Sequence, residues 1–197
     1  MIPRLVLASG SPRRADVMRQ LGLEPEIRPA EIDEAYRPGE TPAEHVERLA
    51  RAKAEAVSRG VADALVIGGD TIVLDGARVL PKPVDADDAV AMLASLSGRT
   101  HGVLSGLAIA GAHGTVSAVS RTRVRMRAFD DATTTAYVST GEPLDKAGAY
   151  GIQGQGAALV AGIDGDYYTV VGFPVGVFLD LLGQVGWRFD FGTLVRT

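Results

Sequence analysis

The chain contains no cysteine among its 197 residues. This absence excludes disulfide bonds, thiolate metal sites and a cysteine nucleophile, and it suits a protein of the reducing cytoplasm. Two motifs are missing as well: the Gly-Lys-Ser/Thr of a phosphate-binding P-loop and the Gly-x-Ser-x-Gly of a serine hydrolase. The sequence therefore excludes several common kinds of nucleotide-binding and hydrolytic site.

Long apolar runs and an excess of positive charge are also absent. No apolar stretch approaches the roughly 20 residues that span a bilayer, and the N-terminal run at residues 5–8 is too short for a signal peptide. The formal net charge is −4, whereas a general nucleic-acid binder needs a basic surface. With 46% apolar and 22% charged residues, the chain can bury a sizeable core in one domain or in two closely packed lobes.

Helix signals dominate the first half of the chain and strand signals the second. This arrangement predicts an α/β fold with a mixed sheet. We expect helices over residues 12–21, 41–58, 85–97 and 131–140 and one that begins at Pro174. We expect strands over residues 5–8, 64–68, 71–74, 78–80, 102–110 and 115–127, extended chain over 24–32 and a hairpin around 164–165.

Residues 9–14 read Ser-Gly-Ser-Pro-Arg-Arg and directly follow the predicted strand at 5–8. Ser11 is a good N-cap and Pro12 suits the first helical position, so a helix begins here. Its first free amides and the two arginines would face one point beyond the strand, and both groups attract phosphate. The segment predicts an anion site; an ordinary strand-to-helix turn with two solvated arginines is the open alternative.

Lys53 lies on the apolar stripe of the helix that begins with the capping box Thr41–Glu44. A buried ammonium without a partner is energetically expensive. Lys53 therefore either extends its charge to the rim of the core, as lysines commonly do, or meets an anion.

Asp70 follows two glycines, Gly68 and Gly69, at or near the end of a predicted buried strand. Carboxylates at the carboxyl ends of such strands commonly face the ligand crevice, and glycines let a metal or a phosphate approach the backbone. Asp70 could then hold a divalent cation or orient a water molecule. A plain turn aspartate is the alternative.

Residues 141–154 combine four glycines with Lys146, Tyr150 and Gln153. The glycines allow a flat ligand to approach closely, and the amide of Gln153 donates and accepts hydrogen bonds at once, as the recognition of a base edge requires. The three histidines lie too far apart in the sequence to predict a metal site, and we interpret them as structural or surface residues: His45, His101 and His113.

Together these segments resemble the Maf-like nucleoside triphosphate pyrophosphatases over nearly the whole chain. The matching segments occur in the family's order at residues 9–14, 68–71, 82–83 and 145–154, with further agreement at 97–101 and 165–174. The resemblance implies an elongated, two-lobed α/β fold with a central mixed β-sheet flanked by helices and a cleft between the lobes, as one domain over residues 1–197 without a separable linker.

The resemblance also implies an activity: hydrolysis of a nucleoside triphosphate to the monophosphate and diphosphate, with Mg²⁺ or Mn²⁺, by a cytoplasmic homodimer. The sequence of residues 150–153, Tyr-Gly-Ile-Gln, resembles the one found in the subfamily that acts on dTTP and UTP. The subfamily that acts on 7-methyl-GTP has a different sequence in this loop. Two residues depart from the family pattern: Gly69 replaces the usual alanine, and Pro81 stands where a glutamate is expected.

The family's functional residues map onto matching positions of this sequence. Asp70 corresponds to the catalytic proton acceptor, and with Glu34 it would hold the metal. Positions linked to substrate choice are Arg13, Thr71 and Gln153, and the polar cleft residues are Ser9, Arg14, Glu34, Lys53 and Lys82.

Two other functions stay open at this point. One is a pyrophosphatase for inosine or xanthosine triphosphates, which a panel of triphosphates would distinguish. The other is a non-catalytic, nucleotide-sensing regulator of cell division, which would bind nucleotide without releasing diphosphate. A water-activating carboxylate such as Asp70 favours an enzyme.

Overall fold

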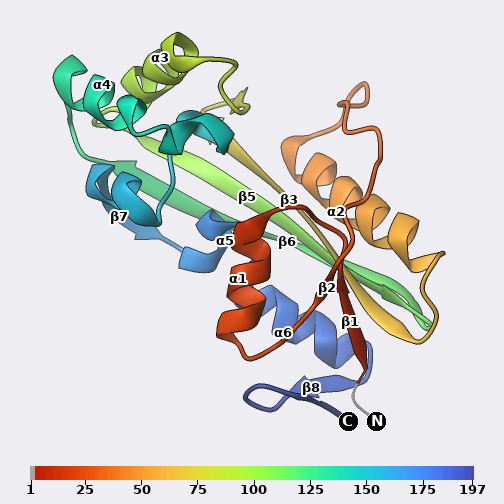
Figure 1. Cartoon of the computed structure of the whole chain (residues 1–197). Coiled ribbons are helices and arrows are strands. Elements are labelled where there is room, and N and C mark those ends of the chain that lie inside the picture. The colour runs from red at the N-terminus through yellow and green to blue at the C-terminus, as the bar shows by residue number, and fades with distance from the viewer. Residues whose placement is uncertain (1–2) are drawn as a thin grey trace. The chain divides into compact units, whose positions relative to one another are not determined.

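The computed structural model describes residues 3–197 (Figure 1). Its strands are β1 (Arg4–Leu7), β2 (Glu26–Ile27), β3 (Ala64–Asp75), β4 (Arg78–Leu80), β5 (Thr100–Gly111), β6 (Gly114–Met126), β7 (Val160–Asp164), β8 (Trp187–Phe189) and β9 (Leu194–Arg196). Its α-helices are α1 (Pro12–Gln20), α2 (Pro42–Ser58), α3 (Ala86–Leu96), α4 (Asp131–Ser139), α5 (Tyr167–Val171) and α6 (Val175–Gln184). Three short 3₁₀ helices are η1 (Glu142–Asp145), η2 (Ala147–Ala149) and η3 (Gly154–Leu159).

Seven strands form one mixed sheet in the order β2-β1-β3-β5-β6-β7, with β4 paired to β3. Strand β1 runs parallel to both β2 and β3, whereas the pairs β3–β4 and β6–β7 are antiparallel. Strands β8 and β9 form a separate hairpin. The mixed sheet flanked by helices confirms the predicted α/β class.

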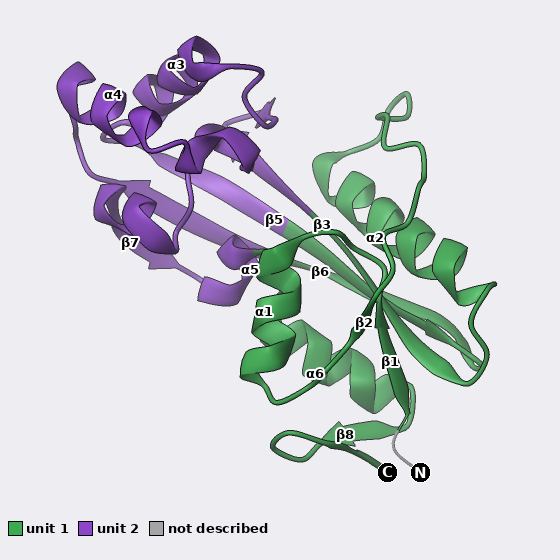
Figure 2. Ribbon diagram, in the orientation of Figure 1, with its two compact units in different colours: residues 1–70, 105–120, 172–197 green, residues 71–104, 121–171 purple. Residues whose placement is uncertain are grey.

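The chain divides into two compact units (Figure 2). The first comprises the described residues up to 70 together with 105–120 and 172–197, and the second comprises 71–104 and 121–171. Strands β3, β5 and β6 each contribute residues to both units. The single domain over the whole chain stays a prediction.

In the first unit, helix α2 packs closely against β3 and β5 because each strand has a glycine at the contact. A Cβ atom on Gly68 would lie 2.2 Å from the carbonyl oxygen of Ala50, and one on Gly106 would lie 2.4 Å from that of Val46. Our placement of Gly68 and Asp70 at a strand end is therefore wrong, since β3 continues to Asp75. The glycines here serve close helix packing and do not form a turn.

The side chains of β3 alternate between the two faces of the sheet, and the face determines which helix a residue contacts. Successive side chains of a strand point to opposite faces of the sheet. Gly68 faces α2, whereas a Cβ on Gly69 would lie 3.1 Å from Nε of Arg14, which belongs to α1. Asp70 shares the face of Gly68, so its carboxylate points toward α2.

The segment at 24–32, expected to be extended, contains the short strand Glu26–Ile27. One further expectation about local structure is wrong, because the chain does not form a hairpin around 164–165. There β7 ends and α5 begins at Tyr167. The Asp166 carboxylate, just before this helix, accepts hydrogen bonds from the amides of Tyr168 and Thr169. The β8–β9 hairpin was not predicted. Within residues 3–197, no helix is both long and apolar enough to cross a membrane.

In the second unit, His101 is a buried histidine that stays neutral. Its side chain is 3% exposed, and Nε2 lies 2.8 Å from the Tyr150 hydroxyl. Nδ1 has no hydrogen-bond partner among the described residues, so a proton added there would be unsatisfied. Burial lowers the pKa of His101 from 6.5 to about 4, although the Asp75 carboxylate opposes the shift.

This histidine predicts a loss of stability in mild acid. Below pH 6.5 His101 becomes protonated in the unfolded chain, whereas in the folded protein it stays neutral down to about pH 4. The free energy of unfolding should therefore fall by up to about 1.4 kcal/mol for each pH unit in this window. We expect a His101→Gln variant to lose about 2 kcal/mol less than the wild type between pH 6.5 and pH 4.5, because His101 of the unfolded chain is only half protonated at pH 6.5. Urea unfolding at several pH values measures this difference, and parallel curves for the two proteins would contradict it.

Candidate functional site

The turn between β1 and α1 holds Arg14 in place. Ser11 occupies the N-cap position and Pro12 the first helical position, as predicted, but the Ser11 side chain makes no capping bond. The Ser9 hydroxyl instead accepts hydrogen bonds from the Ser11 amide at 3.2 Å and from Nη1 of Arg14 at 2.9 Å. Nε of Arg14 also donates to the carbonyl oxygen of Gly172 at 2.9 Å. Arg14 is thus half-buried and anchored at both ends of its guanidinium group.

Lys53 contacts anionic side chains and does not extend its charge to the rim of the core, the other alternative that the sequence left open. Helix α2 begins with the predicted capping box, and Lys53, three turns on, is only 8% exposed. Its Nζ atom lies 2.8 Å from Oδ1 of Asp70 and 2.8 Å from Oε1 of Glu34. The buried ammonium is therefore compensated by two carboxylates.

Asp70 and Arg14 lie in the same charged cluster. The Asp70 side chain is 13% exposed, and the glycine before it leaves room for the Arg14 guanidinium. Burial lowers the pKa of Arg14, and Arg13 lowers it further, while the carboxylates of Asp70 and Glu34 raise it. Three cations and two carboxylates thus influence one another within the first unit.

This cluster contains most of the predicted site residues. Ion pairs join Lys53 to Glu34 and Asp70, a hydrogen bond joins Arg14 to Ser9, and the charges of Asp70, Glu34 and the preceding residue, Arg13, act on Arg14. The other three belong to the second unit: Thr71 directly follows Asp70 in β3, Lys82 is exposed just after β4, and Gln153 is the half-buried N-cap of η3. Their part in the site stays a prediction.

A support for the segment around Glu34 escaped the sequence analysis. Tyr36 stacks on His45 with the ring centroids 3.5 Å apart and the planes parallel to within 1°. Glu40 accepts hydrogen bonds from Arg48, and its Oε2 lies 3.0 Å from Nδ1 of His45. The bonds from Arg48 hold the pKa of Glu40 well below its ordinary value. No spacing rule links these residues, because a loop and a helix bring them together.

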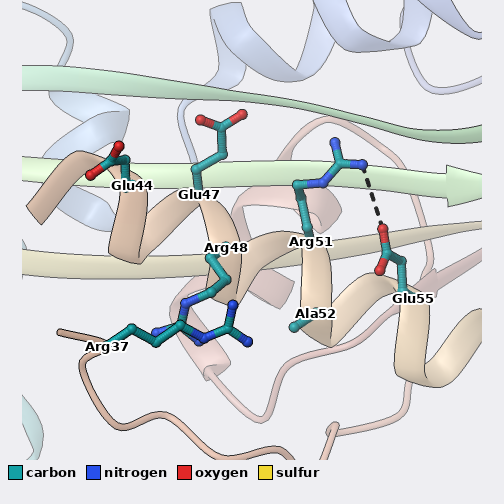
Figure 3. Close-up of a pocket in the computed structure, with 7 residues that line it drawn as sticks. All are labelled: Arg37, Glu44, Glu47, Arg48, Arg51, Ala52 and Glu55. Carbon is teal, nitrogen blue, oxygen red and sulfur yellow. Dashed lines mark ion pairs between the residues drawn. The ribbon is translucent and has the colours of Figure 1, made fainter. Parts of the chain in front are cut away.

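A pocket lined by α2 and by Arg37 of the preceding loop is a separate feature (Figure 3). It is lined by Arg37, Glu44, Glu47, Arg48, Arg51, Ala52 and Glu55. Two of its three arginines already have acidic partners, since Arg51 lies 3.6 Å from Glu55 and Arg48 binds Glu40. None of the predicted site residues lines this pocket, so it is not the candidate site.

The carboxylates of the cluster fit a cation that arrives with a phosphate ligand. Among residues 3–197 there is no group of three or more acidic or histidine side chains that could hold a metal ion alone. Asp70 and Glu34, however, both direct an oxygen at the ammonium of Lys53. Mg²⁺ is commonly bound by one or two carboxylates together with substrate phosphates, and this pair supplies that donor set.

Comparisons with known proteins agree with the motifs. The chain is 52% identical over 187 residues to a dTTP/UTP pyrophosphatase of Moorella thermoacetica, covering 93% of this chain and 95% of the relative. It is 47% identical over 189 residues to a protein of the same name from Symbiobacterium thermophilum, covering 96% and 97%. A third relative so named, from Myxococcus xanthus, is 48% identical over 188 residues, covering 93% and 95%. The family model described as Maf-like protein matches residues 4–185, and the chain belongs to this family.

Proposed function

We propose that this protein is a nucleoside triphosphate pyrophosphatase that hydrolyses dTTP and UTP to the monophosphate and diphosphate. The relatives named dTTP/UTP pyrophosphatase support the substrate. The observation that carries the chemistry is the ammonium of Lys53, held at 2.8 Å from both Asp70 and Glu34 beside the arginine-bearing turn. Cations for phosphate oxygens and a carboxylate for water occur there in one place.

The cations of the first unit bind the triphosphate in this proposal. Arg14 is already oriented by Ser9 and Gly172, and a preoriented guanidinium matches two phosphate oxygens at once. Arg13 precedes it at the start of α1, where free backbone amides also favour an anion. Lys53 adds a charge that is mostly shielded from water, so it acts strongly on a neighbouring phosphate.

Asp70 is the proposed proton acceptor. A water molecule held by its carboxylate gives up a proton to that carboxylate as the water oxygen bonds to the α-phosphorus. The bond between the α-phosphorus and the oxygen bridging to the β-phosphate breaks, and diphosphate leaves with the electron pair. The surrounding cations stabilise the charge that develops on the phosphoryl oxygens, and this stabilisation supplies much of the rate enhancement.

Asp70 and Glu34 would also hold a divalent cation, Mg²⁺ or Mn²⁺. When bound, such an ion neutralises phosphate oxygens and makes the phosphorus easier to attack. Lys53 keeps the two carboxylates together before substrate arrives.

Gln153 and Thr71 are the proposed readers of the pyrimidine base, and Lys82 is a further contact to the triphosphate. A site that forms hydrogen bonds with a base edge rejects a base that leaves those groups unpaired. Selectivity should therefore depend on the position of the Gln153 amide. A homodimer in the cytoplasm, without nucleic acid as a partner, completes the proposal.

A panel of nucleotides tests the proposed function. With Mg²⁺ or Mn²⁺ present, we expect diphosphate release from dTTP and UTP with kcat/KM at least about tenfold above the values for GTP and 7-methyl-GTP. Equal rates with inosine triphosphate would favour the purine-directed alternative. Tight nucleotide binding without diphosphate release would contradict an enzyme of any specificity.

A further inference from the structure

The loop that carries Gln153 is tied to the body of the second unit on both sides of this residue. Gly151 precedes Gln153 by two positions, and Gln155 and Gly156 follow it closely. The backbone amide of Gly151 donates to the Tyr137 hydroxyl, and the amides of Gln155 and Gly156 donate to the Glu142 carboxylate. We call this arrangement the Glu142 clamp: Tyr137, Glu142 and the three amides.

The bonds of the clamp form one connected network. Oε2 of Glu142 accepts from the Gln155 amide at 2.9 Å, and Oε1 accepts from the Gly156 amide at 3.1 Å. The Tyr137 hydroxyl donates to Oε1 of Glu142 at 2.9 Å and accepts from the Gly151 amide at 3.2 Å. Tyr137 is 6% exposed and lies in helix α4, so the network is anchored in the core.

Two glycines of the loop have no side chain because the clamp occupies the space. A Cβ atom on Gly154 would lie 2.8 Å from Oε2 of Glu142. One on Gly156 would lie 2.4 Å from the Tyr137 hydroxyl oxygen and 2.3 Å from the carbonyl oxygen of Gly151. Gly154, one of the glycines that the sequence analysis assigned to a flat ligand, thus makes room for the Glu142 carboxylate, and Gly156 makes room for the Tyr137 hydroxyl.

The charged state of Glu142 suits this role. Burial would raise the pKa of Glu142, but the bonds from the two amides and from Tyr137 outweigh burial and lower it. The carboxylate therefore stays ionised near neutral pH, where it accepts from several donors at once.

We propose that Glu142 is a positioning residue for base selection, which acts through Tyr137 and the loop amides to fix the orientation of the Gln153 amide. This inference rests on the proposed function, in which Gln153 reads the pyrimidine. An amide distinguishes bases only if its donor and acceptor are held at fixed places, since a mobile amide can turn to suit another base. The clamp supplies that restraint without touching the nucleotide.

A Glu142→Gln variant removes one acceptor and leaves the shape of the side chain. The new NH₂ group would then oppose a donor, either a loop amide or the tyrosine hydroxyl. We expect the ratio of kcat/KM for UTP over GTP to fall about tenfold, because small misplacements of a positioning group have effects of this size or larger. The loss should appear mainly in KM for UTP, with kcat changed less than threefold. Tyr137→Phe, which deletes the hydroxyl and keeps the ring, should act in the same direction.

Asp130→Ala is the matched control. Asp130 caps helix α4 by accepting a hydrogen bond from the Thr133 amide at 2.8 Å, so this variant weakens the helix that carries Tyr137 but leaves the clamp intact. We expect its UTP-over-GTP ratio to stay within twofold of the wild type. A fall equal to that of Glu142→Gln would overturn the proposal, because general weakening of α4 would then be the cause.

A double-mutant cycle tests whether Glu142 acts through Gln153. In a Gln153→Ala background the clamp has nothing left to orient, so Glu142→Gln should change the ratio by less than twofold. A further tenfold loss in that background would overturn the assignment.

Amide hydrogen exchange keeps the failure of this inference distinct from failure of the proposed function. In Glu142→Gln we expect exchange over residues 151–156 to be at least about tenfold faster than in the wild type, in the absence of any nucleotide. Unchanged exchange would overturn the clamp. Faster exchange with an unchanged ratio would overturn its role in selectivity. A wild-type protein with no preference for pyrimidines would overturn the proposed function alone, and exchange would still decide whether Glu142 holds the loop.

Discussion

Replacing Asp70 by asparagine should lower kcat for UTP about a thousandfold while nucleotide binding persists. The substitution keeps the size of the side chain and leaves an oxygen that can still accept from Lys53, so the fold around β3 should survive. What it removes is the capacity to take a proton from water. Steady-state diphosphate release gives kcat, and equilibrium titration with a non-hydrolysable analogue gives the affinity. Turnover within tenfold of the wild type would contradict the proposed role.

Asp75→Asn provides the control for this experiment. Asp75 lies on the same strand, its side chain is 12% exposed against 13% for Asp70, and it is also paired with a cation, Arg99, at 2.9 Å. The two variants therefore remove the same charge from similar surroundings. We expect Asp75→Asn to keep kcat within about twofold of the wild type. A comparable loss in both variants would show that lost charge on β3, and not catalysis, explains the result.

Replacing Lys53 by methionine should lower both stability and activity. The variant leaves the largely buried carboxylate of Asp70 beside that of Glu34 without the ammonium between them. Removing one partner of a buried ion pair costs about 3 kcal/mol, and removing one cation from a phosphoryl-transfer site lowers the rate by about 10²-fold or more. Denaturant unfolding and diphosphate release measure the two effects.

The stability effect should depend on Asp70. In the double variant Lys53→Met/Asp70→Asn the uncompensated buried charge of Asp70 is gone and only the exposed carboxylate of Glu34 remains, so we expect the double variant to be more stable than Lys53→Met alone. Arg59→Met, at the exposed C-terminal cap of the same helix, should change the free energy of unfolding by less than about 0.5 kcal/mol. Strictly additive losses from the two single variants would contradict a direct interaction between Lys53 and Asp70.

Much of the fold could be predicted from local signals. The Thr41–Glu44 capping box, the proline at the first position of α1 and the Asp85 cap of α3 each determined a helix start, and each is present. These signals work because they concern backbone groups within one turn of the chain. The inward phase of Lys53 also followed from the helical period alone.

The errors arose where distant segments meet. Gly68 and Gly69 have the composition of a turn, but at Gly68 helix α2 approaches β3 so closely that glycine is required within the strand. Likewise, the glycines of residues 141–154 indicated room for a ligand, and the neighbour of Gly154 is the Glu142 carboxylate. A sequence shows that a side chain is missing; only the fold shows what fills its place. The stack of Tyr36 on His45 gave no signal for the same reason.

The bond from Arg14 to the carbonyl oxygen of Gly172 joins residues 158 positions apart. During synthesis on the ribosome, this arginine leaves the exit tunnel early and has no such anchor until nearly the whole polypeptide has followed. A truncated product that ends before residue 172 would retain every acidic and basic side chain proposed for catalysis, yet Arg14 would lack its bond to Gly172 and keep the one to Ser9. The complete set of bonds that orients Arg14 therefore forms only after residue 172 has been synthesised.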